Sequence, residues 1–144
     1  MDDMFRPLRK YATFSGRARR KEYWLWFLFY LVGAIVVMYL DTALGLAPEP
    51  QTVSEFGDGT AAVGVSFQGG ILTWIFIAAM FIPNLAVGIR RLHDTGKSGW
   101  WLLIGLVPLI GAIVLIVFFV QSGTPGPNEY GPDPKGANHA EVFA

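Results

Sequence analysis

Residues 23–40 read YWLWFLFYLVGAIVVMYL and contain no charged side chain. Two later stretches, 70–89 (GILTWIFIAAMFIPNLAVGI) and 100–120 (WWLLIGLVPLIGAIVLIVFFV), are also uncharged. A helix of about 20 apolar residues, rising about 1.5 Å per residue, crosses a hydrocarbon core about 30 Å thick. Each stretch is apolar around its whole circumference, which suits a helix that faces lipid. The pattern therefore predicts an all-α membrane protein with three transmembrane helices.

A soluble protein, a β-barrel or a cleaved signal peptide fits these apolar stretches less well. A soluble all-α protein would need polar helices to cover three apolar ones, and no other segment is long enough to do so. A β-barrel would show alternating segments of about ten residues, and the sequence has none. The first stretch, at 18 residues, is longer than the apolar region of about 7–15 residues that is typical of a cleaved secretory signal.

The charges indicate how the chain is oriented. Ten of the eleven Lys and Arg residues lie in the segments 1–22 and 90–99, whereas segment 41–69 carries only acidic charges. Positive charge is retained in the cytoplasm. We therefore expect both basic segments on the cytoplasmic side and the loop 41–69 outside. The N-terminal segment could also lie in the membrane interface on the cytoplasmic side. After a third crossing, the tail 121–144 would also be outside.

The third stretch leaves a second topology open. Pro108 and Gly111 interrupt it, and a mild kink in a spanning helix is the expected result. The alternative is a re-entrant hairpin, which would return the tail to the cytoplasm. The tail itself is dense in Gly and Pro, a composition that predicts an extended and flexible segment.

Three pieces of the sequence carry a family resemblance: FSGRARRKEYW at 14–24, RRLHDTGKSGWW at 90–101 and GPNEYGPDP at 126–134. With these pieces the chain resembles the small bacterial inner-membrane proteins grouped as a domain of unknown function (DUF805). Lys97 stands where that family often has Arg, which keeps the charge. The resemblance implies a multi-pass helical protein of the bacterial inner membrane, and it supplies no activity.

Six residues share the membrane level expected for the cytoplasmic lipid head groups. They are Arg19, Arg20, Arg90, Arg91, Lys97 and Ser98. Ser98 or the following glycine is expected to begin the third helix, whose N-terminus presents free amides and a partial positive charge. An anionic phospholipid or an acidic partner segment would suit this group. The structural alternative is that Arg90 and Arg91 pair with Asp94, four and three residues further on, and cap a helix end.

Asn84 is the only carboxamide in the three apolar stretches. Polar residues inside a membrane often face other helices and bond to them. We therefore expect an interhelical hydrogen bond from Asn84, next to a kink at Pro83. A path for a substrate or an ion is the alternative.

The sequence offers little for catalysis or for a cofactor. It has no cysteine and only two histidines, and a zinc site needs about four ligands. His93 and Asp94 are neighbours, which point in different directions on a helix. We expect no enzyme, no cofactor, no metal and no nucleic-acid partner. The leading hypothesis is a membrane component that binds lipid or a protein partner through its basic cytoplasmic face. The alternative is a small transporter or channel subunit, which would require a homo-oligomer because three helices are too few to enclose a path.

Overall fold

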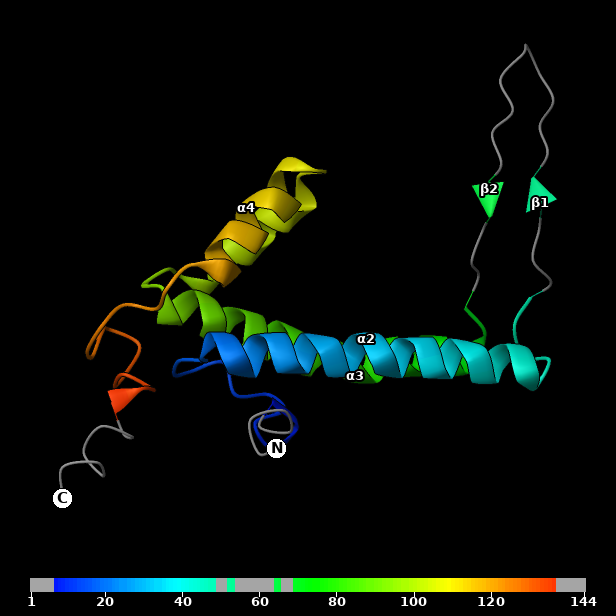
Figure 1. The fold of residues 1–144 in the computed structure, drawn as a ribbon, viewed down its shortest axis with the longest axis horizontal. Coiled ribbons are helices and arrows are strands. Elements are labelled where there is room, and N and C mark those ends of the chain that lie inside the picture. The colour runs from blue at the N-terminus through cyan, green and yellow to red at the C-terminus, as the bar shows by residue number, and fades with distance from the viewer. Residues whose placement is uncertain (1–6, 49–51, 54–63, 66–68, 137–144) are drawn as a thin grey trace, which may run out of the picture. The chain divides into compact units, whose positions relative to one another are not determined.

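The computed structural model describes residues 7–48, 52–53, 64–65 and 69–136. The elements in chain order are helix α2 (Arg20–Ala43), strands β1 (Thr52–Val53) and β2 (Gly64–Val65), helix α3 (Ile71–Asp94), the 3-10 helix η1 (Gly99–Leu106) and helix α4 (Ile110–Val120) (Figure 1). The two short strands pair antiparallel. The predicted helical character is confirmed. Most of the predicted outer loop 41–69, the start of the basic segment and the end of the tail lie outside the described residues.

Helices α2 and α3 correspond to the first two apolar stretches. Each has 24 residues, which gives a length of about 36 Å at about 1.5 Å per residue. Both are long and apolar enough to cross a membrane, with a mean hydropathy of 2.0, whereas α4 is shorter. Large apolar side chains stay exposed along them, among them Leu28 on α2 and Ile75 on α3. Such surfaces fit a lipid environment.

Two compact units make up the chain. One consists of Met1–Tyr30 with Met80–Ala144, and the other of Leu31–Ala79. In the second unit, the fully buried carboxylate of Asp41 accepts hydrogen bonds from the amides of Leu72 (3.0 Å) and Thr73 (2.8 Å). It also accepts one from the Thr73 hydroxyl (2.6 Å). Because the first amides of a helix have no partner within it, Asp41 caps the start of α3.

The third apolar stretch differs from the prediction. In place of one helix over 100–120, the structure has η1 and α4, which lie side by side as a hairpin (Figure 1). The rings of Trp101 and Phe118 meet edge to face, 5.4 Å apart. The prediction of a continuous third helix is therefore wrong, and the hairpin alternative describes this segment. Pro108, which has no amide to continue a helix, lies at the turn.

The turn of the hairpin is a tight γ-turn. The Ile110 amide donates to the Pro108 carbonyl over 2.7 Å. Between them, Leu109 has φ 63° and ψ −60°, a strained backbone conformation that few residues with a side chain adopt. The strain is tolerated because the packed arms determine where the turn must be.

The turn is also suited to apolar surroundings. The Val107 amide bonds to the Ile104 carbonyl (2.9 Å) and the Gly111 amide bonds to that of Val107 (3.0 Å). Leu106 and Leu109 leave 79% and 81% of their surface exposed. The bonds made by the amides of Val107, Ile110 and Gly111 lower the free-energy cost of placing this turn in apolar surroundings.

The contact between the arms supplies a test. A Cβ added at Gly111 would overlap the carbonyl oxygen of Ile104, whereas one added at Gly105 would meet only the end of the Leu115 side chain at 3.1 Å. Gly111→Ala should therefore force the arms apart and lower the free energy of unfolding by about 1–3 kcal/mol. Gly105→Ala, the matched control, should change it by less than about 1 kcal/mol. Unfolding in a mild detergent measures both, and equal effects would contradict the observed packing.

Candidate functional site

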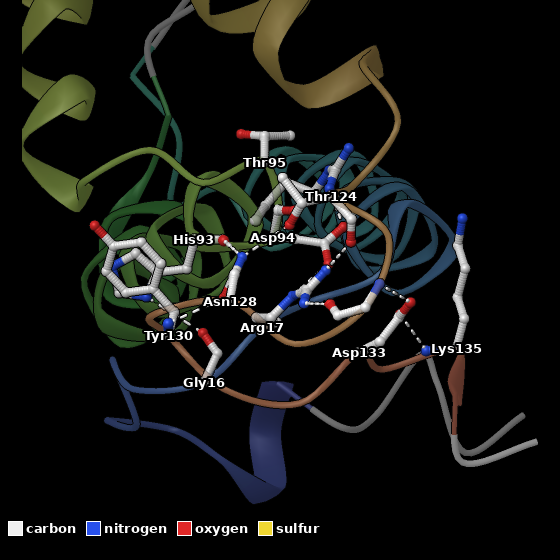
Figure 2. A network of polar contacts seen from close by, with 12 residues as sticks. Gly16, Arg17, His93, Asp94, Thr95, Thr124, Asn128, Tyr130, Asp133 and Lys135 are labelled. Carbon is white, nitrogen blue, oxygen red and sulfur yellow. Dashed lines mark hydrogen bonds and ion pairs between the residues drawn. The ribbon is translucent and has the colours of Figure 1, made fainter.

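A buried carboxylate joins two arginines at the end of α3. Asp94 accepts from Nε of Arg17 at 3.0 Å and from Nη1 of Arg91 at 2.6 Å. All three side chains are at most 4% exposed. Figure 2 shows Arg17 reaching Asp94 from the segment that precedes α2. Charge-assisted bonds of this kind are short and strong. They are also required here, since a buried charge without a partner is strongly unfavourable.

A second buried pair links the first turn of α2 to α3. Nη1 of Arg90 donates to Glu22 over 2.7 Å, and both side chains are at most 3% exposed. The Arg90 carbonyl accepts from the Ala18 amide at 2.9 Å. Nε and Nη2 of Arg90 have no hydrogen-bond partner among the described residues. The pair therefore fixes the start of α2 against α3 without using every donor of the guanidinium.

Arginine side chains cap the end of α4. Arg91 donates to the carbonyls of Phe119 (3.1 Å) and Gln121, and Arg20 lies 3.4 Å from the Val120 carbonyl. The last carbonyls of a helix have no partner within the helix and carry partial negative charge. Cations at this end satisfy both requirements.

The tail folds back onto the same cluster. Arg17 donates to the carbonyls of Thr124 and Gly126, each at 2.6 Å, and the Thr124 amide donates to the Asp94 carbonyl at 2.8 Å (Figure 2). A Cβ at Gly123 would overlap the Asp94 carboxylate, so glycine permits this approach. The prediction of an extended, flexible tail is therefore wrong for residues 121–136.

Ring stacking adds a second attachment for the tail. The rings of His93 and Tyr130 are parallel within 5°, with centroids 3.9 Å apart. The Asn128 amide group donates to the His93 carbonyl over 2.9 Å, and Nδ1 of His93 lies 3.2 Å from the Gly16 carbonyl (Figure 2). Desolvation raises the pKa of Tyr130, and the neighbouring Glu129 raises it further. His93 thus serves as a structural contact between the N-terminal segment and the tail.

Asp133 holds the far end of this segment. Its carboxylate accepts from the amides of Lys135 (2.8 Å) and Gly126 (3.0 Å). These two bonds stabilise the ionised form, so the pKa of Asp133 lies below its usual value. The tail is therefore tied to itself as well as to the helices.

The predicted basic group divides into buried and accessible members. Arg91 pairs with Asp94 as one hypothesis expected, but Arg90 pairs with Glu22. Both arginines are buried in these ion pairs.

The remaining members lie near the end of α4 or at the start of η1. Nζ of Lys97 lies 4.5 Å above the Phe118 ring and 3.2 Å from Oε1 of Gln121. Ser98 caps η1, with its hydroxyl accepting from the Trp100 amide at 3.4 Å. Arg20 is exposed, and Arg19 is half-buried.

Asn84 lies on the wall of an apolar cavity. Its Oδ1 accepts from Nε1 of Trp26 over 2.7 Å, an interhelical bond between α3 and α2. The cavity has a volume of about 360 Å³. Most of its lining is apolar, with aromatic rings from Tyr23, Trp26, Phe27, Tyr30, Phe81 and Phe119.

Several of these contacts were not evident from sequence. Arg17, Glu22, Thr124 and Asn128 have their partners far along the chain, with Arg17 and Asp94 separated by 77 positions and Arg17 and Gly126 by 109. The glycine at 123, where a side chain would overlap the Asp94 carboxylate, is a signal that could have indicated a close approach of the tail. Among the described residues, no group of three His, Asp or Glu side chains is placed to hold a metal ion.

Removing one partner of a buried pair tests the cluster. Glu22→Gln would leave the Arg90 charge buried without a counter-charge, and should lower the free energy of unfolding by about 3–5 kcal/mol. Glu129→Gln makes the same change at an exposed position and should stay within about 0.5 kcal/mol. Thermal unfolding in mild detergent compares the two. A small effect at Glu22 would mean that the pair is not buried in the membrane protein.

Comparisons with known proteins agree on one family. The family described as "Protein of unknown function (DUF805)" matches residues 11–132. "Inner membrane protein YhaH" of Escherichia coli K12 is 44% identical over 135 residues, covering 94% of this chain and 98% of the relative. "Inner membrane protein YhaI" of the same strain is 41% identical over 128 residues, covering 89% and 91%. No solved structure matches. The chain therefore belongs to the DUF805 family.

Proposed function

We propose that this inner-membrane protein is a non-enzymatic component that binds anionic phospholipid on its cytoplasmic side. The distribution of charge supports the proposal. Residues 7–30 and 80–136 carry ten Lys and Arg against four Asp and Glu, whereas residues 31–79 carry no Lys or Arg. Anionic lipids attract such a basic surface by about 1 kcal/mol for each Lys or Arg near it.

The proposed topology differs from three simple crossings. Helix α2 crosses outward and α3 crosses back, while the η1–α4 hairpin enters and leaves on the cytoplasmic side. Eight residues of 3-10 helix and eleven of α-helix both extend about 16 Å, half of a hydrocarbon core. The bonds from Arg17 to Thr124 and Gly126 favour a tail on the same side as the N-terminus. All Lys and Arg are then cytoplasmic, as the charge rule requires.

Arg20, which is exposed, and Lys97, which is half-buried, are the best candidates for lipid contact. The arginines at 17, 90 and 91 are buried in ion pairs. Arg20 and Lys97 are more accessible and meet at neighbouring positions, Val120 and Gln121, at the end of α4. A phosphate there would face two positive charges and few competing carboxylates.

Transport by an oligomer has less support. Asn84, the one carboxamide in the predicted spans, is bonded to Trp26. A polar group that is satisfied within one chain supplies no free ligand for a passing ion. Lipid binding therefore remains the preferred function.

Single cysteines in this cysteine-free chain test the topology. Cysteines replace Ser54, Thr95 and Ser122 in separate variants. An impermeant thiol reagent applied to intact cells should label position 54 alone, because positions 95 and 122 face the cytoplasm. Permeabilised cells provide the control, in which all three should react. Labelling at position 122 in intact cells would instead support a third complete crossing.

The lipid preference is tested by native mass spectrometry from mild detergent. The wild type should retain phosphatidylglycerol in preference to phosphatidylcholine. Replacing Arg20 and Lys97 together by Gln should weaken that retention by roughly tenfold to thirtyfold, at about 1 kcal/mol each. Lys135→Gln, at an exposed position in the tail, should have a smaller effect. Equal retention of both lipids by the wild type would reject the proposed function.

A further inference from the structure

One wall of the apolar cavity described above lies next to Arg20, whose side chain is exposed. Tyr23 and Phe119 both line it, and their rings lie 4.4 Å apart. Arg20 precedes Tyr23 by three residues, which places both on one face of α2. Its guanidinium lies 3.4 Å from the carbonyl of Val120, the residue after Phe119. The cation is therefore next to the residues that form one wall of the cavity.

The second cation reaches the same helix end. Nζ of Lys97 lies 3.2 Å from Oε1 of Gln121 and 4.5 Å above the Phe118 ring. Arg20 and Lys97 thus contact consecutive residues, Val120 and Gln121. An anion bound between them would be held by a guanidinium with several N–H donors and by an ammonium group.

The interior of the cavity is apolar, in contrast to the charged groups of Arg20 and Lys97. Its volume of about 360 Å³ falls within the range of about 300–1,000 Å³ that is usual for ligand sites. Six aromatic residues line it, and the Asn84 carboxamide oxygen already accepts a bond from Trp26. Walls of this kind offer water few hydrogen bonds, whereas they give a hydrocarbon chain close dispersion contacts.

We propose that this cavity takes one acyl chain of an anionic phospholipid whose phosphate is bound by Arg20 and Lys97. The combination of an apolar cavity with adjacent cations is complementary to an amphiphile with a negative head group. The inference rests on the proposed function and makes it specific. It assigns a defined site to one lipid molecule, in place of a general attraction between a basic surface and the bilayer.

The first test uses the unaltered protein. Phosphatidylglycerol with a photoactivatable diazirine in one acyl chain is mixed with phosphatidylcholine in nanodiscs that contain the full chain. After irradiation, peptide mapping should find cross-links at Tyr23, Tyr30 or Phe119, which line the cavity, in excess of those at Leu103 and Ile113, which are exposed on the hairpin. Unlabelled phosphatidylglycerol should compete with the cavity cross-links, whereas phosphatidylcholine should not. Cross-links confined to the hairpin surface would overturn the proposal.

A matched pair of substitutions provides the second test. Leu85→Trp places a larger side chain in the cavity wall, whereas Leu103→Trp makes the same change on exposed surface. The first should reduce the cavity cross-links to the level of the hairpin positions, and the second should leave them unchanged. Arg20→Gln should weaken phosphatidylglycerol binding about fivefold, for one basic contact.

The two proposals fail in different ways. If the wild type shows no preference for phosphatidylglycerol over phosphatidylcholine, the proposed function is wrong and the acyl-chain site is lost with it. If the preference is present but the cavity positions never cross-link above the hairpin positions, the basic face binds lipid and the acyl-chain site is wrong.

Discussion

The ion pairs of Asp94 with Arg17 and Arg91 hold together three parts of the chain that are far apart in sequence. One carboxylate attracts both guanidiniums, and their other N–H groups reach backbone carbonyls between Phe119 and Gly126. Replacement of a buried ion pair by apolar residues is often neutral or stabilising. The Asp94 ion pairs are therefore better described as fixing the positions of the three chain segments that they join, because charged hydrogen bonds require a specific geometry.

Charged side chains also complete the ends of the helices. Asp41 binds the free amides at the start of α3, and Arg91 binds free carbonyls at the end of α4. Both side chains are fully buried, so they satisfy these backbone groups in place of solvent. Each side chain has the charge opposite to the partial charge of the helix end that it binds. The chain thus places ionisable residues where its helices stop and leaves their central parts uncharged.

The sequence predicts some of these features and not others, for a physical reason. Hydropathy is a local property, and it identified α2 and α3. Hydropathy also shows that residues 100–120 are apolar. An apolar segment, however, can either cross a bilayer or turn back within it. Pro108 and Gly111 were the available signals for the turn, and a kink was the more conservative interpretation.

The site was harder to predict because its contacts are long-range. Glu22 and Arg90 are separated by 68 positions, so no spacing rule connects them. Asp41 was assigned to a loop because the apolar run ends one residue earlier, at Leu40. Intrahelical spacing did suggest the Arg91–Asp94 pair, but it gave no reason to prefer Glu22 as the partner of Arg90. The compact tail was missed because its Gly and Pro content is equally typical of flexible segments.

The attachment of the tail to Arg17 has a consequence for the order of events during synthesis. Arg17 and Asp94 emerge from the ribosome before Thr124 and Gly126, at a translation rate of about 5–20 residues per second. The first two can pair while the carbonyl partners of Arg17 are still missing. The segment that contains Thr124 and Gly126 therefore closes the cluster, and a chain without it leaves N–H groups of the buried Arg17 without these acceptors. The buried hydrogen bonding of Arg17 is therefore complete only after the segment that follows α4 has been made, so the cluster forms in a defined order along the chain.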